Sequence, residues 1–170
     1  ILVGYGMDEG VQMGPVISGA AKQRITGLID DAESRDARVV LDGRTLEVAG
    51  HQDGHFLGPT ILLDVPLDSP CYQQEVFGPV LTIISADSYE EAMAIVNGSK
   101  FGNGSAIFTN DGGVARRFSL DVEAGMVGVN VPIPTPVAYY SFGGWKDSLF
   151  GDTHIHGPEG VRFYTKLKTI

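Results

Sequence analysis

The sequence predicts an α/β fold in which a parallel sheet carries helices on both faces. Three observations lead to this prediction. Strand-like apolar runs alternate with amphipathic helical stretches between residues 80 and 131. The run at 80–85 is almost entirely apolar, as in strands buried on both faces of a parallel sheet. The abundance of glycine, 23 of 170 residues, is typical of a globular protein with many tight turns.

The first predicted element is an amphipathic helix from about Ser18 to Arg35, with Ser18 as its N-cap. Its apolar stripe recurs at helical spacing and comprises Ala21, Ile25, Leu28, Ile29 and Ala32. The chain after this helix is expected to be extended. An apolar run at 39–41 stops at Asp42-Gly43 and resumes with Leu46 and Val48, a pattern typical of a β-hairpin. A polar surface loop is expected at 49–59, followed by strands at 60–65 and 80–85.

The second half is expected to continue the alternation of helix and strand. Ser88 caps a helix at 87–99, in which Glu90 and Glu91 complement the dipole of the first turn. The elements expected after it are a strand at 104–109, a helix at 113–122 and a strand at 125–131. This order implies right-handed crossovers between parallel strands.

The last forty residues differ from the rest. Residues 131–160 are irregular, and irregular segments of this length usually serve binding or an interface. Residues 161–170 alternate, with Phe163, Thr165 and Leu167 on one face, which predicts a terminal strand. Two roles are open for this strand, a contact between subunits and an edge strand of the same subunit.

Composition excludes several classes of function. The net charge is −9 and the twelve basic residues are scattered, which argues against a nucleic-acid binder. A single cysteine excludes an internal disulfide framework. Neither a signal peptide nor an apolar run long enough for a membrane span is evident. We therefore expect a soluble, cytoplasmic protein with one compact domain.

Cys71 lies four positions before Glu75 in the segment CYQQEVFGPV. A thiolate with a carboxylate base is one hypothesis for this pair. However, Pro70 disfavours a helical placement of Cys71, and residues four apart in an extended segment are too distant to pair. We expect Cys71 to be an ordinary half-buried cysteine, because free cysteines are mostly simply packed.

Glu75 precedes Phe77-Gly78-Pro79 at the expected lip of a strand, where parallel sheets form ligand crevices. A surface acid and a ligand-binding carboxylate both remain open from the residues alone. The two histidine pairs, His51 with His55 and His154 with His156, lack a third ligand. No metal site is predicted, and these histidines are expected in solvated loops.

Several motifs occur together and in a fixed order. They are MGPVIS, GPTIL, EVFGPVL, GNGSAIFT, GMVGVNVPIP, SFGGWKDSLFGDTH and GVRFYTKLKTI. Over essentially its whole length the chain thereby resembles the C-terminal part of aldehyde dehydrogenases. The VGVNVPIP and FYTKLKT stretches, and KDSLFGD after the paired glycines, resemble the branch of methylmalonate-semialdehyde dehydrogenases that acylates coenzyme A.

The resemblance implies roles for individual residues. Glu75 would accept hydrogen bonds from the hydroxyls of the nicotinamide ribose of NAD, and Phe77 would pack against the nicotinamide end. Phe142 matches the aromatic that lines the aldehyde pocket, and Asn130 is given a structural role only. The resemblance also implies coenzyme A as co-substrate and a homo-oligomer joined through the terminal strand.

In domain terms, the resemblance makes residues 1–150 the C-terminal part of the catalytic domain and residues 151–170 a segment with the oligomerisation strand. The family's NAD-binding domain and its Gly-Gln-x-Cys nucleophile segment are absent from these residues. We therefore expect part of an enzyme that oxidises malonate or methylmalonate semialdehyde to an acyl-CoA, inactive by itself. The alternatives are a non-catalytic assembly module and part of a water-using aldehyde dehydrogenase.

Overall fold

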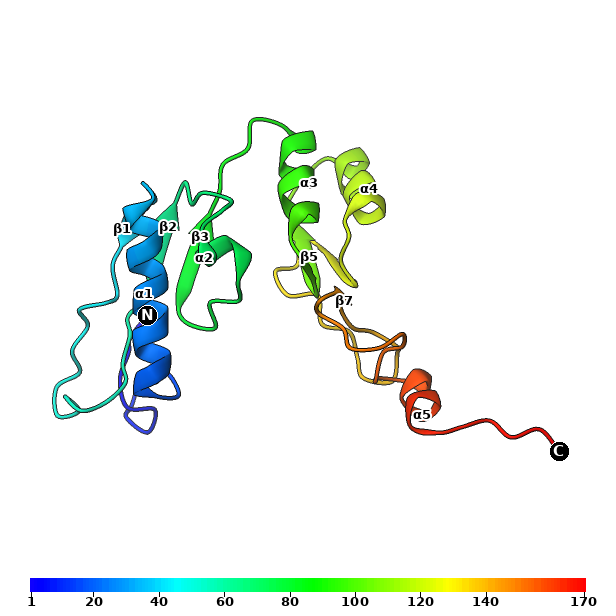
Figure 1. The fold of residues 1–170 in the computed structure, drawn as a ribbon, viewed down its shortest axis with the longest axis horizontal. Coiled ribbons are helices and arrows are strands. Elements are labelled where there is room, and N and C mark those ends of the chain that lie inside the picture. Colours follow the sequence, from blue (N-terminus) through cyan, green and yellow to red (C-terminus); the bar gives the residue numbers. More distant parts are fainter. The chain divides into compact units, whose positions relative to one another are not determined.

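The computed structural model describes residues 1–170. These residues form two compact units, residues 1–86 and residues 87–170 (Figure 1). Each unit has its own core and is described by itself. The division at residue 86 differs from the single compact domain expected from the sequence. The boundary predicted between residues 150 and 151, which concerns the layout of the complete family fold, stays a prediction.

In the first unit, the predicted long helix is present as α1, Gly19–Ser34. Ser18 is its N-cap, as predicted, and the Ser18 Oγ accepts a hydrogen bond from the Ala21 amide at 3.1 Å. The predicted apolar stripe is the buried face of this helix, with Ile25, Leu28, Ile29 and Ala32 all buried. The stripe packs onto Leu57, Leu62 and Val65, which form the core of the unit. Spacing along the sequence therefore predicted both the helix and its buried side.

The sheet of the first unit has three strands in the order β1-β2-β3. They are β1 (Arg38–Leu41), β2 (Thr60–Leu63) and β3 (Val80–Ile83). β1 runs antiparallel to β2, and β2 runs parallel to β3. Because the β1–β2 pair is antiparallel, the expectation of a purely parallel sheet is wrong for this unit.

The predicted hairpin at 39–48 is also wrong. β1 pairs with β2 rather than with residues 46–48, which form no strand. The Gly43 amide donates to the Thr60 Oγ1 at 3.0 Å, and the Gly43 carbonyl accepts from the Gly58 amide at 2.9 Å. These bonds direct the chain leaving β1 toward β2, so a tertiary contact replaced the local turn.

Strand β3 is exposed on one face, whereas its apolar sequence predicted burial on both. Its residues alternate between half-buried and exposed, and Leu81 is 55% exposed. β3 is an edge strand of this sheet, while Leu62 on the central strand is fully buried. Between β2 and β3 lies a single helical turn, α2 (Pro70–Gln73), capped by Ser69.

The second unit has the predicted order of helix, strand, helix and strand. Its elements are α3 (Tyr89–Gly98), β4 (Phe101–Gly102), β5 (Gly104–Ile107), α4 (Gly112–Asp121), β6 (Met126–Val129) and β7 (Trp145–Lys146). β5 and β6 are parallel, as expected for strands joined through a helix, and β4 pairs antiparallel with β7. The sheets of the chain are therefore short and mixed rather than one continuous parallel sheet.

Local capping explains the start of α3. The Ser88 Oγ accepts from the Glu91 amide at 3.1 Å, and the Glu91 carboxylate accepts from the Asp87 amide at 2.7 Å. α3 and α4 lie next to each other in Figure 1 and bury Met93 and Phe118 together. Arg117 of α4 also pairs with Glu90 of α3 at 2.8 Å.

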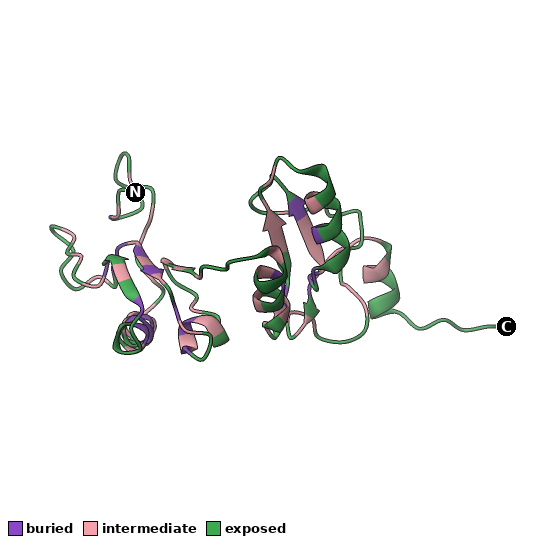
Figure 2. Ribbon diagram, turned by 90° about the horizontal axis from the view of Figure 1, so that it is seen from above, coloured by how far each residue is buried: buried purple, intermediate pink, exposed green.

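The predicted terminal strand at 161–170 is wrong for residues 161–164, which are helical, and stays a prediction for residues 165–170. Residues Pro158–Tyr164 form helix α5, and the chain beyond it is extended and unpaired (Figure 1). Pro158 stands at the favoured first helical position, and Arg162 pairs with Glu159 across one turn at 2.7 Å. A strand needs a partner for its backbone groups, and this chain offers residues 165–170 none. Figure 2 shows this tail as exposed throughout.

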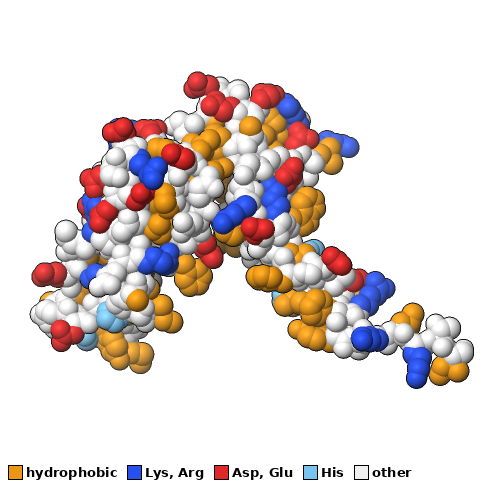
Figure 3. Space-filling view, in the orientation of Figure 1, with side chains coloured by type: hydrophobic (Ala, Val, Ile, Leu, Met, Phe, Trp, Pro, Cys, Tyr) orange, Lys and Arg blue, Asp and Glu red, His pale blue; other side chains and the backbone are white.

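No helix in the structure is long and apolar enough to cross a membrane. Acidic and basic side chains are interspersed on the face drawn in Figure 3. This pattern agrees with the scattered basic residues of the sequence.

Candidate functional site

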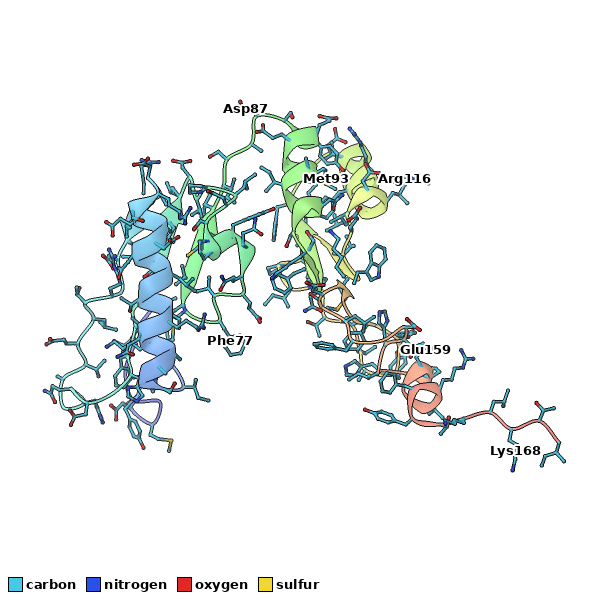
Figure 4. The ribbon with its side chains drawn as sticks, in the orientation of Figure 1. Phe77, Asp87, Met93, Arg116, Glu159 and Lys168 are labelled. Carbon is cyan, nitrogen blue, oxygen red and sulfur yellow. The ribbon has the colours of Figure 1, made fainter.

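The segment between α2 and β3 presents Glu75 and Phe77 on the surface of the first unit. The Gln74 amide donates to the Pro70 carbonyl at 2.9 Å and closes the turn of α2. Glu75 follows directly and is exposed. Phe77 is 76% exposed, and Figure 4 shows its ring projecting from the end of this loop.

Phe77 has a left-handed backbone, with φ of 48°. This conformation is uncommon for a side chain with a bulky ring and costs about 1–3 kcal/mol, so neighbouring contacts must maintain it. Gly78 lies tightly against α1, because a Cβ built on it would stand 2.5 Å from the Ile25 Cδ1. On the β3 side, the Pro79 carbonyl accepts from the Thr60 amide at 2.8 Å. The turn is therefore held from both sides.

An open pocket of about 510 Å³ adjoins the Phe77 ring. It lies at the start of α1 and is lined mainly by apolar groups. The lining residues are Val16, Ile17, Ala20, Ala21, Arg24 and Phe77. A flat ring bound here would contact one aromatic face and several aliphatic groups.

The Glu75 carboxylate takes part in none of the ion pairs of the chain. An ionised carboxylate has two oxygens that accept hydrogen bonds and none that donates. Such a group two residues before an exposed aromatic ring, in the same turn, fits a ligand that combines adjacent hydroxyls with a flat heterocycle. These residues therefore fit the nicotinamide riboside end of a dinucleotide.

Cys71 is packed, as expected, but it is fully buried in the core of the first unit rather than half-buried. Its thiol donates to the Leu28 carbonyl at 3.2 Å. Burial, with a smaller contribution from the negative charge of Asp31, raises the pKa of the Cys71 thiol above its ordinary value. A thiol with a raised pKa is a poor nucleophile, so this geometry disfavours a catalytic role.

The sequence argument against a helical Cys71 was nevertheless wrong in its premise. Pro70 is the first residue of α2, a position where its missing amide hydrogen is no loss, and Cys71 follows it in the turn. The turn directs the thiol into the core. Glu75, four residues on, is exposed instead, so the two do not form a nucleophile and base.

Phe142, the predicted aldehyde-pocket residue, belongs to the second unit and packs against a histidine. Its ring stacks on His156 with centroids 4.3 Å apart and the planes 1° from parallel. A pocket of about 430 Å³ opens beside this pair, lined also by His154, Phe163 and Tyr164 among others. Phe142 therefore lines a cavity of the second unit, and its contact with the aldehyde stays a prediction.

The four histidines lie in loops, as expected, with His51 and His55 exposed and His154 and His156 half-buried. Three of them also make packing contacts. His154 and His156 line the pocket beside Phe142, and His51 stacks on Tyr5 with centroids 5.3 Å apart. In the sequence, the spacing of His154 and His156 was the signal that these two side chains lie on the same face of the chain. No group of three or more metal-binding side chains exists in the structure.

Asn130 joins the ends of two neighbouring strands. Its side-chain amide donates to the Thr109 carbonyl at 3.1 Å, and its side-chain oxygen accepts from the Thr109 amide at 3.0 Å. Both groups of the side chain are thus engaged with the backbone, which is the structural role expected for Asn130.

The comparison with protein families matches the model of the aldehyde dehydrogenase family to residues 1–170. Malonate-semialdehyde dehydrogenase of Pseudomonas aeruginosa is 51% identical over 99% of this chain and 34% of its own length. The acylating, mitochondrial methylmalonate-semialdehyde dehydrogenase of Arabidopsis thaliana is 48% identical over 97% of this chain and 27% of its own length.

Among solved structures, a protein from Sinorhizobium meliloti assigned as a methylmalonate-semialdehyde dehydrogenase, in complex with NAD, superposes with a TM-score of 0.96. It is 47% identical, with 100% of this chain and 35% of that one covered. The mixed α/β architecture is thus that of aldehyde dehydrogenases. The chain spans about a third of the length of these relatives, and the expected C-terminal position of that third stays a prediction.

Proposed function

Because the chain belongs to the aldehyde dehydrogenase family, we propose that it forms part of an NAD-dependent enzyme that oxidises malonate or methylmalonate semialdehyde to an acyl-CoA. The observation that carries the proposal is that Glu75, whose carboxylate is in no ion pair, and the Phe77 ring, two residues further on, are both exposed in one short turn. Relatives named for these two semialdehydes, including an acylating one, support the choice of substrate and acceptor.

In this proposal, the first unit positions the cofactor. The Glu75 carboxylate accepts hydrogen bonds from the ribose hydroxyls, and the Phe77 ring packs against the nicotinamide. NAD, when bound, accepts a hydride from the substrate carbon. The apolar pocket at the start of α1 excludes water from one face of the nicotinamide ring.

The second unit contributes to the aldehyde pocket in the same proposal. Phe142, stacked on His156, provides an apolar wall for the substrate. The nucleophilic thiolate comes from residues outside these 170, because Cys71 is buried and its thiol is engaged with the Leu28 carbonyl. That thiolate adds to the aldehyde, and the acyl group then passes from it to coenzyme A.

The test is an assay of the complete protein that contains this chain, with malonate semialdehyde, NAD and coenzyme A. We expect NADH and an acyl-CoA to form in equal amounts, followed by absorbance and mass spectrometry. The 170-residue chain alone is the control and is expected to form neither. Free acid in place of acyl-CoA would assign a water-using enzyme, and no NADH with either semialdehyde would refute the proposed oxidation.

We also propose that the complete protein is a homo-oligomer in which residues 165–170 contact a second copy. Leu167 and Ile170 are fully exposed in this chain, and the backbone around them is unpaired. Native mass spectrometry should give a multiple of the chain mass, and removal of residues 165–170 should lower it. An unchanged assembly after removal would contradict a role for this segment.

The predicted cytoplasmic location stays a prediction, because the Arabidopsis relative is named as mitochondrial.

A further inference from the structure

We propose that Arg24 is the positioning residue that keeps the Glu75–Phe77 turn in its binding conformation. The Arg24 Nη2 donates a hydrogen bond of 2.7 Å to the Val76 carbonyl, across 52 residues of sequence. The inference rests on the proposed function, in which Glu75 and Phe77 contact the cofactor. It adds a residue that acts through the backbone of that turn.

The position of the accepting carbonyl carries the argument. The Val76 carbonyl belongs to the peptide unit that joins Val76 to Phe77. Rotation of this unit changes the ψ angle of Val76 and the φ angle of Phe77 together. A hydrogen bond to this oxygen therefore acts directly on the torsion of Phe77, which is left-handed at 48°.

The other contacts of the turn do not act on this peptide unit. Gly78 packs on Ile25, and the Pro79 carbonyl is bound by the Thr60 amide, so both contacts lie after Phe77. Before Glu75, the nearest backbone bond is that of the Gln74 amide. Without Arg24, the 76–77 unit is free to rotate toward the right-handed or extended conformations that Phe prefers.

Arg24 has no competing acidic partner, because none of the ion pairs of the chain includes it. Its guanidinium is always charged, and a charge-assisted hydrogen bond to a carbonyl is stronger than a neutral one. Arg24 also lines the pocket beside Phe77, so the group that holds the turn stands next to the ring that it orients.

The experiment uses the complete protein and compares Arg24→Met with Arg24→Lys and Lys22→Met. Met keeps the aliphatic stem and removes the donor, whereas Lys keeps a charged donor. Lys22 lies on the same helix, and Lys22→Met removes the same charge without touching Val76. Two quantities are measured, amide hydrogen exchange of residues 74–80 without cofactor and the dissociation constant of NADH by fluorescence.

With Arg24→Met, we expect exchange of the Gln74 and Val80 amides, which donate backbone hydrogen bonds on either side of the turn, to accelerate about tenfold or more, while exchange of α1 is unchanged. The NADH dissociation constant should rise about fivefold or more. In Arg24→Lys, both the exchange rate and the NADH dissociation constant should be close to those of the unmodified protein. In Lys22→Met, both should equal those of the unmodified protein.

Unchanged exchange in Arg24→Met would overturn the inference, whatever the value of the NADH dissociation constant. Faster exchange with an unchanged NADH dissociation constant would overturn the link between the turn and the cofactor. If the unmodified protein fails to bind NADH, the proposed function fails, and the exchange data alone then decide whether Arg24 holds the turn.

Discussion

Replacing Glu75 with Gln in the complete protein is expected to slow turnover about tenfold or more and to weaken NAD binding. Gln is nearly the same size but neutral, and an NH2 donor replaces one of the two acceptor oxygens of the carboxylate. Gln therefore offers the two ribose hydroxyls one neutral acceptor oxygen in place of two charged ones, and hydrogen bonds to a charged group are worth about 1.5–3 kcal/mol. Steady-state kinetics with varied NAD should give the larger change in kcat/KM for NAD, with KM for the aldehyde nearly unchanged.

Two further variants make this result specific. Glu47→Gln removes another exposed carboxylate from the same unit and should leave the kinetics unchanged. Cys71→Ala should leave turnover nearly intact, because the Cys71 thiol is buried and bonded to the Leu28 carbonyl. If Cys71→Ala abolished turnover without unfolding the protein, the nucleophile would lie in this chain after all. A Glu75→Gln enzyme as active as Glu47→Gln would remove the proposed role of Glu75.

Replacing Gly125 with Ala is expected to have the largest effect on stability, lowering the free energy of unfolding by about 3 kcal/mol. A Cβ on Gly125 would overlap the Gly143 carbonyl and stand 3.1 Å from the Gly144 carbonyl carbon. Both neighbours are backbone, so the clash cannot be relieved by rotating a side chain. Because Gly143 follows Phe142, the pocket beside Phe142 should be distorted as well.

Urea denaturation followed by circular dichroism measures the effect, and Gly112→Ala is the matched control. Gly112 is the first residue of α4, and nothing lies within 4 Å of a Cβ built there. Ala favours a helix more than Gly does, so Gly112→Ala should be neutral or slightly stabilising. Equal stabilities of the two variants would show that the backbones near Gly125 are not as close as described.

The long helices α1, α3 and α4 were predictable because their signals are local. Ser18 and Ser88 each stand directly before a periodic apolar stretch, and each accepts the expected hydrogen bond from the first turn. The terminal segment shows the limit of such patterns. Alternation at 161–170 fits a strand, but a strand is stable only with a partner, and the chain offers none to these residues. Pro158 and the Glu159–Arg162 pair were local helix signals that the alternation outweighed in the prediction.

In the candidate site, too, some features were predictable from the sequence and others were not. The motif around Glu75 and Phe77 identified the residues from sequence alone, since the resemblance depends only on the order of letters. Their exposure and the left-handed Phe77 could not be predicted, because they depend on Arg24 and Ile25, about fifty residues earlier. The same reason applies to the stacking of Phe142 on His156, which joins two segments of irregular backbone.

The sequence by itself thus determined the three long helices α1, α3 and α4, the serine caps of α1 and α3, the buried stripe of α1 and the family to which the motifs point. Only the tertiary structure decided that β1 pairs with β2, that Cys71 faces the core and that Phe77 projects outward from a strained turn. Helix signals act over one or two turns of chain, whereas strand pairing, burial and strained turns depend on contacts between residues far apart in sequence.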